Sequence, residues 1–379
     1  MVEKVEEIVA LLSDLNDVNG VRDMAEQRLA EGDAAFVADL GVALFRTYGA
    51  AKRPIWQYRS VFDSVFRLLT VAADAEHLGH ALRLIGTVAS GDRKMARYAA
   101  SLLASSRPAS DLTRAFAGGQ VHAGGLEELR ACLVHELVLR GEAVGDLQGI
   151  AQWATSRHRG HHPLSWLPLH RSSIEQSPDL PSYSVHGSSY SLPFGPFDTG
   201  VGPAPAGDGE TASAVETTTP SAAAEMARAV ANWAEESNGR IEARTFALSA
   251  AGGSIAKLLS VLDLDCLAPE GQRSAPSAFA CAPPQVWQVL FAAASTGGAY
   301  NNGLHGAYGR LEAWKSMAGL SGAPQTATFA DVERHIHDHR WFTFSATTKW
   351  FEQVAWDIAV AALSPDGRSL AVLAATDTD

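Results

Sequence analysis

The sequence has little of three features that would point to particular classes of protein. Only three cysteines occur in 379 residues, which argues against a disulfide-stapled secreted fold and predicts reduced thiols. No apolar run approaches the roughly 20 residues of a membrane-spanning helix, so no membrane association is predicted. Residues 1–12 carry acidic side chains where a secretion signal would be basic. We therefore expect a cytoplasmic protein.

Basic charge is also scarce. Lysine and arginine total 30 against 42 acidic residues, which gives a formal net charge of −12. Nonspecific binding of nucleic acid needs a cationic face that displaces counterions from phosphates. Nucleic acid is therefore not an expected partner.

What the sequence does contain is apolar residues at helical spacing. Hydrophobic residues make up 46% and charged residues 19%, as in a globular protein, and the length favours two domains. The helices predicted from this spacing in residues 1–156 cover Val2–Leu15, Met24–Glu31, Ala34–Tyr48, Ile55–Ala73, Ala75–Ser90, Arg93–Ser105, Leu112–Ala117, Leu126–Leu139 and Leu147–Thr155. Short links without strand signals predict an all-α, antiparallel helical array that resembles a superhelix.

The periodicity ends in residues 157–220, which are rich in proline, serine and glycine. Aromatic side chains such as Trp166 and Tyr183 favour burial, so we expect an ordered, irregular segment packed at the junction between the domains. Residues 198–219 have the composition of a mobile loop.

Residues 221–379 mix both kinds of element and predict an α+β domain. Strand patterns occur at 240–248 and 341–345, and two further strands flank a tight turn at 364–367, so a small antiparallel sheet ends the chain. A short helix is predicted at 348–355. Two helix starts have recognisable caps: Thr219 followed by Pro220, and Thr328 with Asp331 three residues later. The predicted fold is therefore mostly α, with this α+β domain following the helical array.

The first candidate site is the segment Thr296–Trp314, which holds five glycines between two predicted helices. Arg310 lies in the first turn of the second helix, where backbone N–H groups also favour an anion. The candidate ligand-binding residues are Asn301, Asn302 and Arg310, and the candidate acid–base residues are Tyr300, His305 and Tyr308. The alternative is a glycine-built corner in which Arg310 pairs with a buried carboxylate. The spacing fits neither a phosphate loop nor a dinucleotide fingerprint, so no cofactor is indicated.

Two further groups of residues are candidate sites, each with fewer supporting features in the sequence. His186, Ser188 and Tyr190 form a polar strip that could bind a ligand, although hydroxyls that satisfy an irregular backbone explain it as well. His335 and His339 have the i, i+4 spacing of paired zinc ligands on a helix. With no third ligand in the pattern, an exposed histidine-rich helix end is the alternative.

Three stretches, 180–196, 297–314 and 350–379, resemble a family of uncharacterised actinomycete proteins, classified only as a domain of unknown function. The resemblance lies mostly in the C-terminal half and agrees with a bacterial, cytoplasmic protein. It implies no activity, cofactor or catalytic residue. Two functions remain open: a binding protein whose helical array presents a concave face to a protein partner, or an enzyme acting on a small polar or anionic molecule at 296–310.

Overall fold

The computed structural model describes residues 4–71, 77–89, 92–117, 124–156, 160–176, 178–193, 213–251, 254–268, 276–351 and 355–378. The chain divides into two compact units. The first comprises residues 1–165 and 181–189, and the second comprises residues 166–180 and 190–379. Residues 157–220 are thus shared between the two units.

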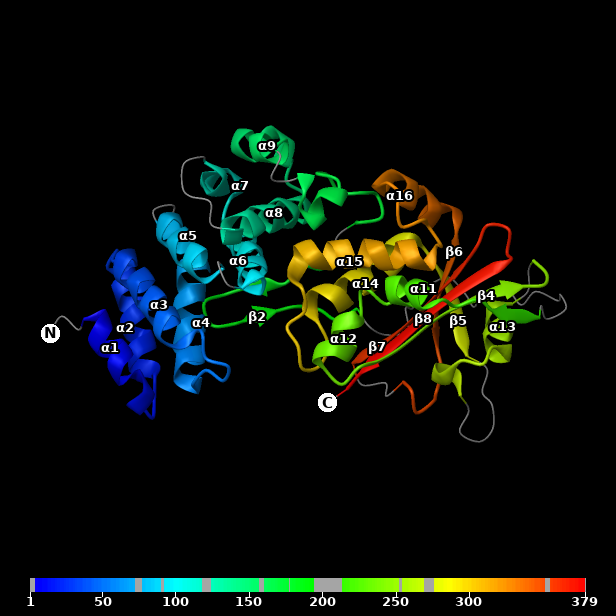
Figure 1. The fold of residues 1–379 in the computed structure, drawn as a ribbon, viewed down its shortest axis with the longest axis horizontal. Helices are drawn as coiled ribbons and strands as arrows, with labels where there is room; N and C mark the ends of the chain where they lie inside the picture. The colour runs from blue at the N-terminus through cyan, green and yellow to red at the C-terminus, as the bar shows by residue number, and fades with distance from the viewer. Residues whose placement is uncertain are drawn as a thin grey trace. The chain divides into compact units, whose positions relative to one another are not determined.

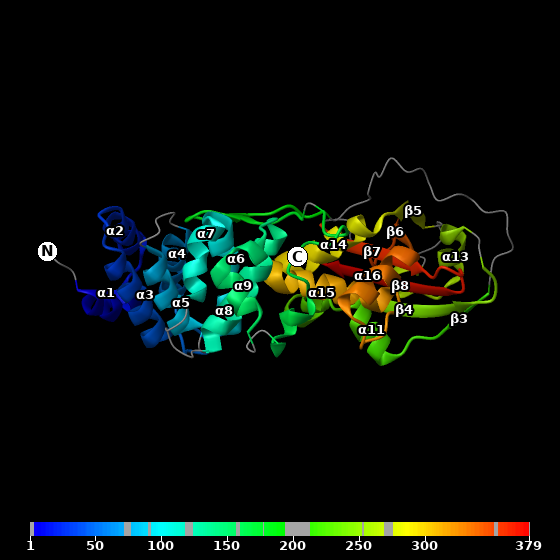
Figure 2. The ribbon, with the colours of Figure 1, turned by 90° about the horizontal axis from the view of Figure 1, so that it is seen from above.

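The first unit is built from helices joined by short links (Figures 1 and 2). Its helices are α1 (Val5–Leu11), η1 (Leu12–Asp14), α2 (Asn19–Ala30), α3 (Ala34–Tyr48), α4 (Trp56–Val71), α5 (His77–Val88), α6 (Arg93–Ser106), α7 (Ala109–Leu112), η2 (Thr113–Phe116), α8 (Gly124–Leu139), η3 (Val144–Asp146) and α9 (Gln148–Ala154). Helix α3 packs against α1, α4 and α5, and α6 packs against α4 and α8. Two of the helix starts are capped by aspartate: Asp33 accepts from Phe36 N, and Asp92 accepts from Lys94 N.

A ladder of aromatic rings runs through this unit. Tyr58, Phe62 and Phe66 lie on one face of α4 at helical spacing, with ring centroids 5.3 and 5.9 Å apart. The ring of Tyr98 on α6 stacks on Phe66 at 5.9 Å, and the ring of Tyr183 meets Tyr98 edge-on at 6.3 Å. Because Tyr183 belongs to the short hairpin β1 (Ser182–Tyr183) and β2 (Ser188–Ser189), the ladder fixes that hairpin on the helices.

The second unit contains a six-stranded antiparallel sheet with the order β3-β4-β8-β7-β6-β5. Its strands are β3 (Ala214–Glu216), β4 (Arg240–Leu248), β5 (Ser277–Cys281), β6 (Arg340–Ser345), β7 (Trp356–Leu363) and β8 (Ser369–Asp377). β7 and β8 form the hairpin predicted around residues 364–367. They lie in the middle of the sheet, which explains why their sequence is almost continuously apolar.

Helices cover both faces of this sheet. On one face lie α11 (Pro220–Met226), α12 (Ala231–Glu236), α14 (Pro283–Thr296) and α15 (His305–Leu320), and α15 also packs against α16 (Phe329–Asp338) (Figure 1). The other face buries Phe246, Leu370 and Val372 against α13 (Ile255–Val261), with η5 (Asp265–Leu267) nearby. Trp233, Trp287 and Trp314 are fully buried among the helices of the first face.

The mostly α fold with an α+β C-terminal part is confirmed. Both predicted helix caps are present: Thr219 Oγ1 accepts from Ala222 N with Pro220 at the first helical position, and Thr328 and Asp331 bond reciprocally. The helix predicted at 348–355 is wrong for the described part, since residues 348–351 and 355 are not helical. The mobile loop predicted at 198–219 is wrong at residues 214–216, which form an edge strand; residues 198–212 lie outside the described residues.

No helix in the described part of the chain is both long and apolar enough to cross a bilayer.

All three cysteines are free thiols, and we expect them to resist alkylation in the folded protein. Burial raises the pKa of Cys132 well above its usual range and that of Cys281 to about 12, so at pH 8 both thiols stay protonated. Iodoacetamide at pH 8 followed by mass spectrometry should therefore find little modification of the native protein, and three modified cysteines after denaturation. Rapid modification of Cys281, the most exposed of the three, would contradict this environment.

Candidate functional site

The glycine-rich loop between α14 and α15 makes a tight corner. Gly297 and Gly303 have φ of +84° and +63°, a region that side chains rarely adopt. A Cβ on Gly298 would lie 1.9 Å from Asp377 Oδ2, and one on Gly303 would lie 2.5 Å from backbone atoms of Gly297 and Ser295. The glycines are therefore required for close backbone approach, which supports the corner described as the alternative to a ligand pocket.

The polar groups of this corner are largely engaged within the second unit. Asn301 Oδ1 accepts from Gly298 N at 2.6 Å, and its Nδ2 donates to Asn232 O at 2.7 Å. The buried carboxylate of Asp377 accepts from Ala299 N at 2.7 Å. Both the oxygen and the nitrogen of the Asn301 side-chain amide are therefore used in hydrogen bonds that stabilise the corner.

The remaining loop candidates differ in their exposure to solvent. Tyr300 is 60% exposed, and Asn302 is also exposed. His305 begins α15 with a φ of +60°, and Tyr308 is buried on that helix. None of these residues lines the pocket at His186 or the pocket at Arg240 that are described below.

Arg310 is fully buried and pairs with Glu175, which is also fully buried. Its Nε and Nη2 donate to the two carboxylate oxygens of Glu175 at 2.6 and 2.8 Å, and its Nη1 and Nη2 donate to Pro168 O and His170 O. Trp314 Nε1 donates to the same carboxylate at 2.6 Å. These contacts argue against the expected role of Arg310 in holding a ligand anion, because its charge is already neutralised inside the core.

The histidines considered for a metal site lie at the end of α16. His339 is the residue after that helix, and its Nδ1 lies 2.7 Å from His335 O. Burial lowers the pKa of His339. Among the described residues, no group of three or more histidine, cysteine or acidic side chains could hold a metal ion.

His186 lies in a different setting, at a pocket of about 470 Å³ within the first unit. The pocket is lined by Arg22 of α2, by Val185 and His186 of the hairpin turn, and by Trp56, Arg59, Ser60, Asp63 and Ser64 of α4. The α4 residues recur at three- and four-residue steps and so share one face of that helix. Of the other two strip residues, Ser188 pairs with Tyr183 in the hairpin, and Tyr190, 50% exposed, belongs to the second unit.

Two hydrogen bonds hold the hairpin on the helices. Tyr183 and Ser101 share a hydrogen bond of 3.0 Å between their hydroxyl oxygens, and Arg67 Nη1 donates to Ser184 O at 3.5 Å. Burial raises the pKa of Tyr183 to about 12, so the hydroxyl stays neutral. Ser184 Oγ accepts from Gly187 N and stabilises the turn that carries His186. The Ser184 hydroxyl therefore bonds to the backbone N–H of Gly187. This is the role that the alternative interpretation gives to the hydroxyl groups of the polar strip.

The charge of this pocket is positive. Arg22 and Arg59 make no side-chain hydrogen bond or ion pair with any described residue, and Arg22 Nε is buried without a partner. The one acidic lining residue, Asp63, is already paired, since Arg67 Nε donates to it at 3.0 Å. Both unpaired arginines lie near the N-termini of their helices, where the helix dipole disfavours a cation and favours an anion. The pocket therefore offers two uncompensated cations to a negatively charged ligand.

Seven of the eight residues that line this pocket were not among the candidates predicted from the sequence: Arg22, Trp56, Arg59, Ser60, Asp63, Ser64 and Val185. One signal was available, because Trp56, Arg59 and Asp63 place an aromatic and two charged residues on one face of a helix whose other face is apolar. No signal in the sequence connects Arg22 or His186 to that face, since they lie 34 or more positions from Trp56.

The chain matches one family of proteins. Residues 19–379 match a family described as a family of unknown function, DUF6183. The match covers nearly the whole chain, which corrects the expectation that the likeness lies mostly in the C-terminal half. No curated protein and no solved structure matches the chain.

Proposed function

The chain belongs to DUF6183, a family of unknown function, and from this premise we propose that it is a binding protein whose helical unit takes up a small anion. The binding site is the pocket formed by α2, α4 and the 184–187 turn. One observation carries the proposal: Arg22 Nε is buried at this pocket with no hydrogen-bond partner. A buried donor without a partner costs about 1–3 kcal/mol, a cost that a bound anion would remove.

The dimensions and lining of the pocket suit a small molecule. Its volume of about 470 Å³ falls within the usual range for ligand sites. Arg22 and Arg59 would donate paired hydrogen bonds to a phosphate or carboxylate group. Ser60 and Ser64 add hydroxyl groups to the lining. The indole of Trp56, 49% exposed, offers a flat apolar surface to the rest of the ligand.

The other functions predicted from the sequence have less support. An enzyme acting at the 296–310 loop would need Arg310 for its substrate, and Arg310 already pairs with Glu175. A protein partner for the helical array stays a prediction. A cytoplasmic setting belongs to the same proposal and is supported by the three free thiols. A bacterial origin stays a prediction.

Calorimetric titration with inorganic phosphate and with citrate would test this site. We expect the wild-type protein to bind at least one of them, and binding to weaken as salt is raised. Replacing Arg22 with methionine removes a charge-assisted hydrogen bond worth about 1.5–3 kcal/mol, which corresponds to roughly 10- to 150-fold in Kd. The same variant should fold normally, because Arg22 has no partner to lose.

Arg93→Met is the matched control, since Arg93 is an exposed arginine at the start of α6 and lies outside the pocket. It should bind like the wild type. The proposal fails if neither anion binds, or if Arg93→Met weakens binding as much as Arg22→Met.

A further inference from the structure

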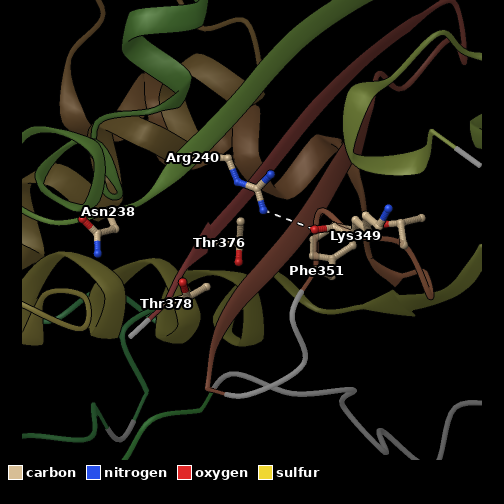
Figure 3. Close-up of a pocket in the computed structure, with 7 residues that line it drawn as sticks. Asn238, Arg240, Lys349, Phe351, Thr376 and Thr378 are labelled. Atoms are coloured by element: carbon tan, nitrogen blue, oxygen red, sulfur yellow. Dashed lines mark hydrogen bonds between the residues drawn. The ribbon is translucent and has the colours of Figure 1, made fainter. Parts of the chain in front are cut away.

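A second pocket lies in the other unit, at one end of the sheet face that packs against α13. It has a volume of about 600 Å³, and Figure 3 shows the side chains around it. Its lining residues are Asn238, Arg240, Thr348, Lys349, Phe351, Thr376 and Thr378. Arg240 on β4 and Thr376 on β8 are direct cross-strand partners, so their side chains emerge on the same face.

The strand register shows where this face of the sheet changes from apolar to polar residues. Along β8 the residues that share a face with Thr376 are Ala374, Val372 and Leu370, all buried in the apolar core with α13. Thr376 is the point at which that apolar row ends and the polar lining begins. On its other side, Thr376 pairs with Asp357 of β7, which is not among the residues that line the pocket.

The hydroxyl of Thr376 is unsatisfied. The residue is 1% exposed, and its Oγ1 has no hydrogen-bond partner. Valine has the same shape and would fill this strand position without leaving a buried hydroxyl unpaired. A threonine here costs stability unless something in the pocket bonds to it.

Two cationic residues, Arg240 and Lys349, line the same pocket as this hydroxyl. Arg240 is held in place because its Nη2 donates to Lys349 O at 3.2 Å (Figure 3). The same nitrogen donates to Trp350 O at 3.1 Å. Its guanidinium carbon also lies 5.0 Å from the ring centroid of Trp350. Lys349 lines the same pocket, and none of the described lining residues is acidic. The lining thus combines two positive charges with three threonine hydroxyls and one amide.

We propose that this pocket is a second ligand site and that it binds a small hydroxylated oxyanion. Arg240 and Lys349 supply the charge that a phosphate or carboxylate group needs. Thr376, Thr378 and Asn238 supply donors and acceptors for the hydroxyl groups of the same molecule. The Thr348 hydroxyl donates to Cys266 O at 2.9 Å and can still accept from the ligand. Bound there, the ligand gives Thr376 Oγ1 the partner that the protein does not provide.

Calorimetric titration of the full chain with three related probes would test the site. Glycerol 3-phosphate and glycerate carry the two possible anionic groups, and glycerol is the neutral comparison. We expect one of the two anions to bind and glycerol not to bind, with the better anion identifying the charged group. Thr376→Val should weaken binding of that anion at least 10-fold while leaving the melting temperature unchanged or higher.

Thr343→Val is the matched control. Thr343 is also a buried strand threonine whose Oγ1 has no partner, but it lies on β6 and outside the pocket. It should change thermal stability as Thr376→Val does and leave binding intact. If no probe binds the wild-type protein, or if both valine variants weaken binding equally, the second site is disproved. Because the Arg22 pocket would also bind a phosphate or carboxylate group, the titrations are repeated in the Arg22→Met variant, where the binding that Thr376→Val weakens should persist. Failure of one pocket then does not imply failure of the other.

Discussion

Replacing Arg310 with methionine should lower the free energy of unfolding by about 3–5 kcal/mol, the typical cost of removing one partner from a buried ion pair. Methionine preserves much of the volume, so the loss reports mainly the charge. Glu175 would remain fully buried with its carboxylate deprived of two charged donors, although Trp314 Nε1 and Ser172 N still donate to it. Urea denaturation followed by tryptophan fluorescence would measure the change, since Trp314 contacts the same carboxylate.

Two further variants separate charge from packing. Arg334→Met removes an arginine that pairs with Asp331 on the surface, where the Arg334 side chain is 65% exposed, and should change stability little. The double variant Arg310→Met with Glu175→Leu removes both buried charges and should recover much of the loss. If Arg310→Met is no less stable than Arg334→Met, the Arg310–Glu175 ion pair does not stabilise the fold. Arg310 would then again be a candidate for binding a ligand.

Gly303→Ala should strongly destabilise the 296–310 corner. The residue has a φ of +63°, which costs a side-chain-bearing residue roughly 1–2 kcal/mol. In addition, the new Cβ would lie 2.5 Å from backbone atoms of Gly297 and Ser295, which cannot rotate away. Overpacking of this kind adds about 1–3 kcal/mol, so we expect a total loss of about 2–5 kcal/mol.

Gly322→Ala provides the comparison that isolates the close approach. Gly322 has nearly the same φ, +64°, but a Cβ there would meet no atom within 4 Å. Thermal denaturation should therefore show a loss of only about 1–2 kcal/mol for this variant. Equal losses for Gly303→Ala and Gly322→Ala would mean that the backbone conformation alone accounts for the glycine, and that the corner is not tightly packed.

Together these variants test whether the most conspicuous stretch of the sequence is structural. Clusters of glycine, asparagine and arginine occur both in ligand loops and in tight corners, because both require close backbone approach and many donors. In this protein the donors of Asn301 and Arg310 go to Asn232, Glu175 and nearby carbonyl oxygens. The composition of residues 296–314 thus predicted a tight backbone corner, but it did not predict whether the corner binds a ligand.

Local features of the fold could be predicted from the sequence because they depend on neighbouring residues. Apolar spacing located the helices α3, α4 and α6 to within a few residues, and the caps at Thr219 and Thr328 form as their side chains require. The central strands β7 and β8 were visible because a tight turn separates two apolar runs.

Edge elements were harder to predict, for a physical reason. β3 and β5 are short strands at the two edges of the sheet, where one side of the backbone is already unpaired and little apolar pattern is needed. Residues 348–351 have helix-forming neighbours, yet here tertiary contacts override propensity: Arg240 bonds to the carbonyls of Lys349 and Trp350, which keeps the segment irregular.

The sequence by itself determined helices such as α3, α4 and α6, the β7–β8 hairpin and the concentration of glycine at 296–310, because each depends on neighbouring residues. Only the tertiary structure decided what the charged residues do. It paired Arg310 with Glu175 across 135 positions, and it left Arg22 Nε without a partner beside Arg59 and His186. Whether an arginine is neutralised or available depends on which carboxylate the fold brings next to it, and sequence spacing does not contain that information.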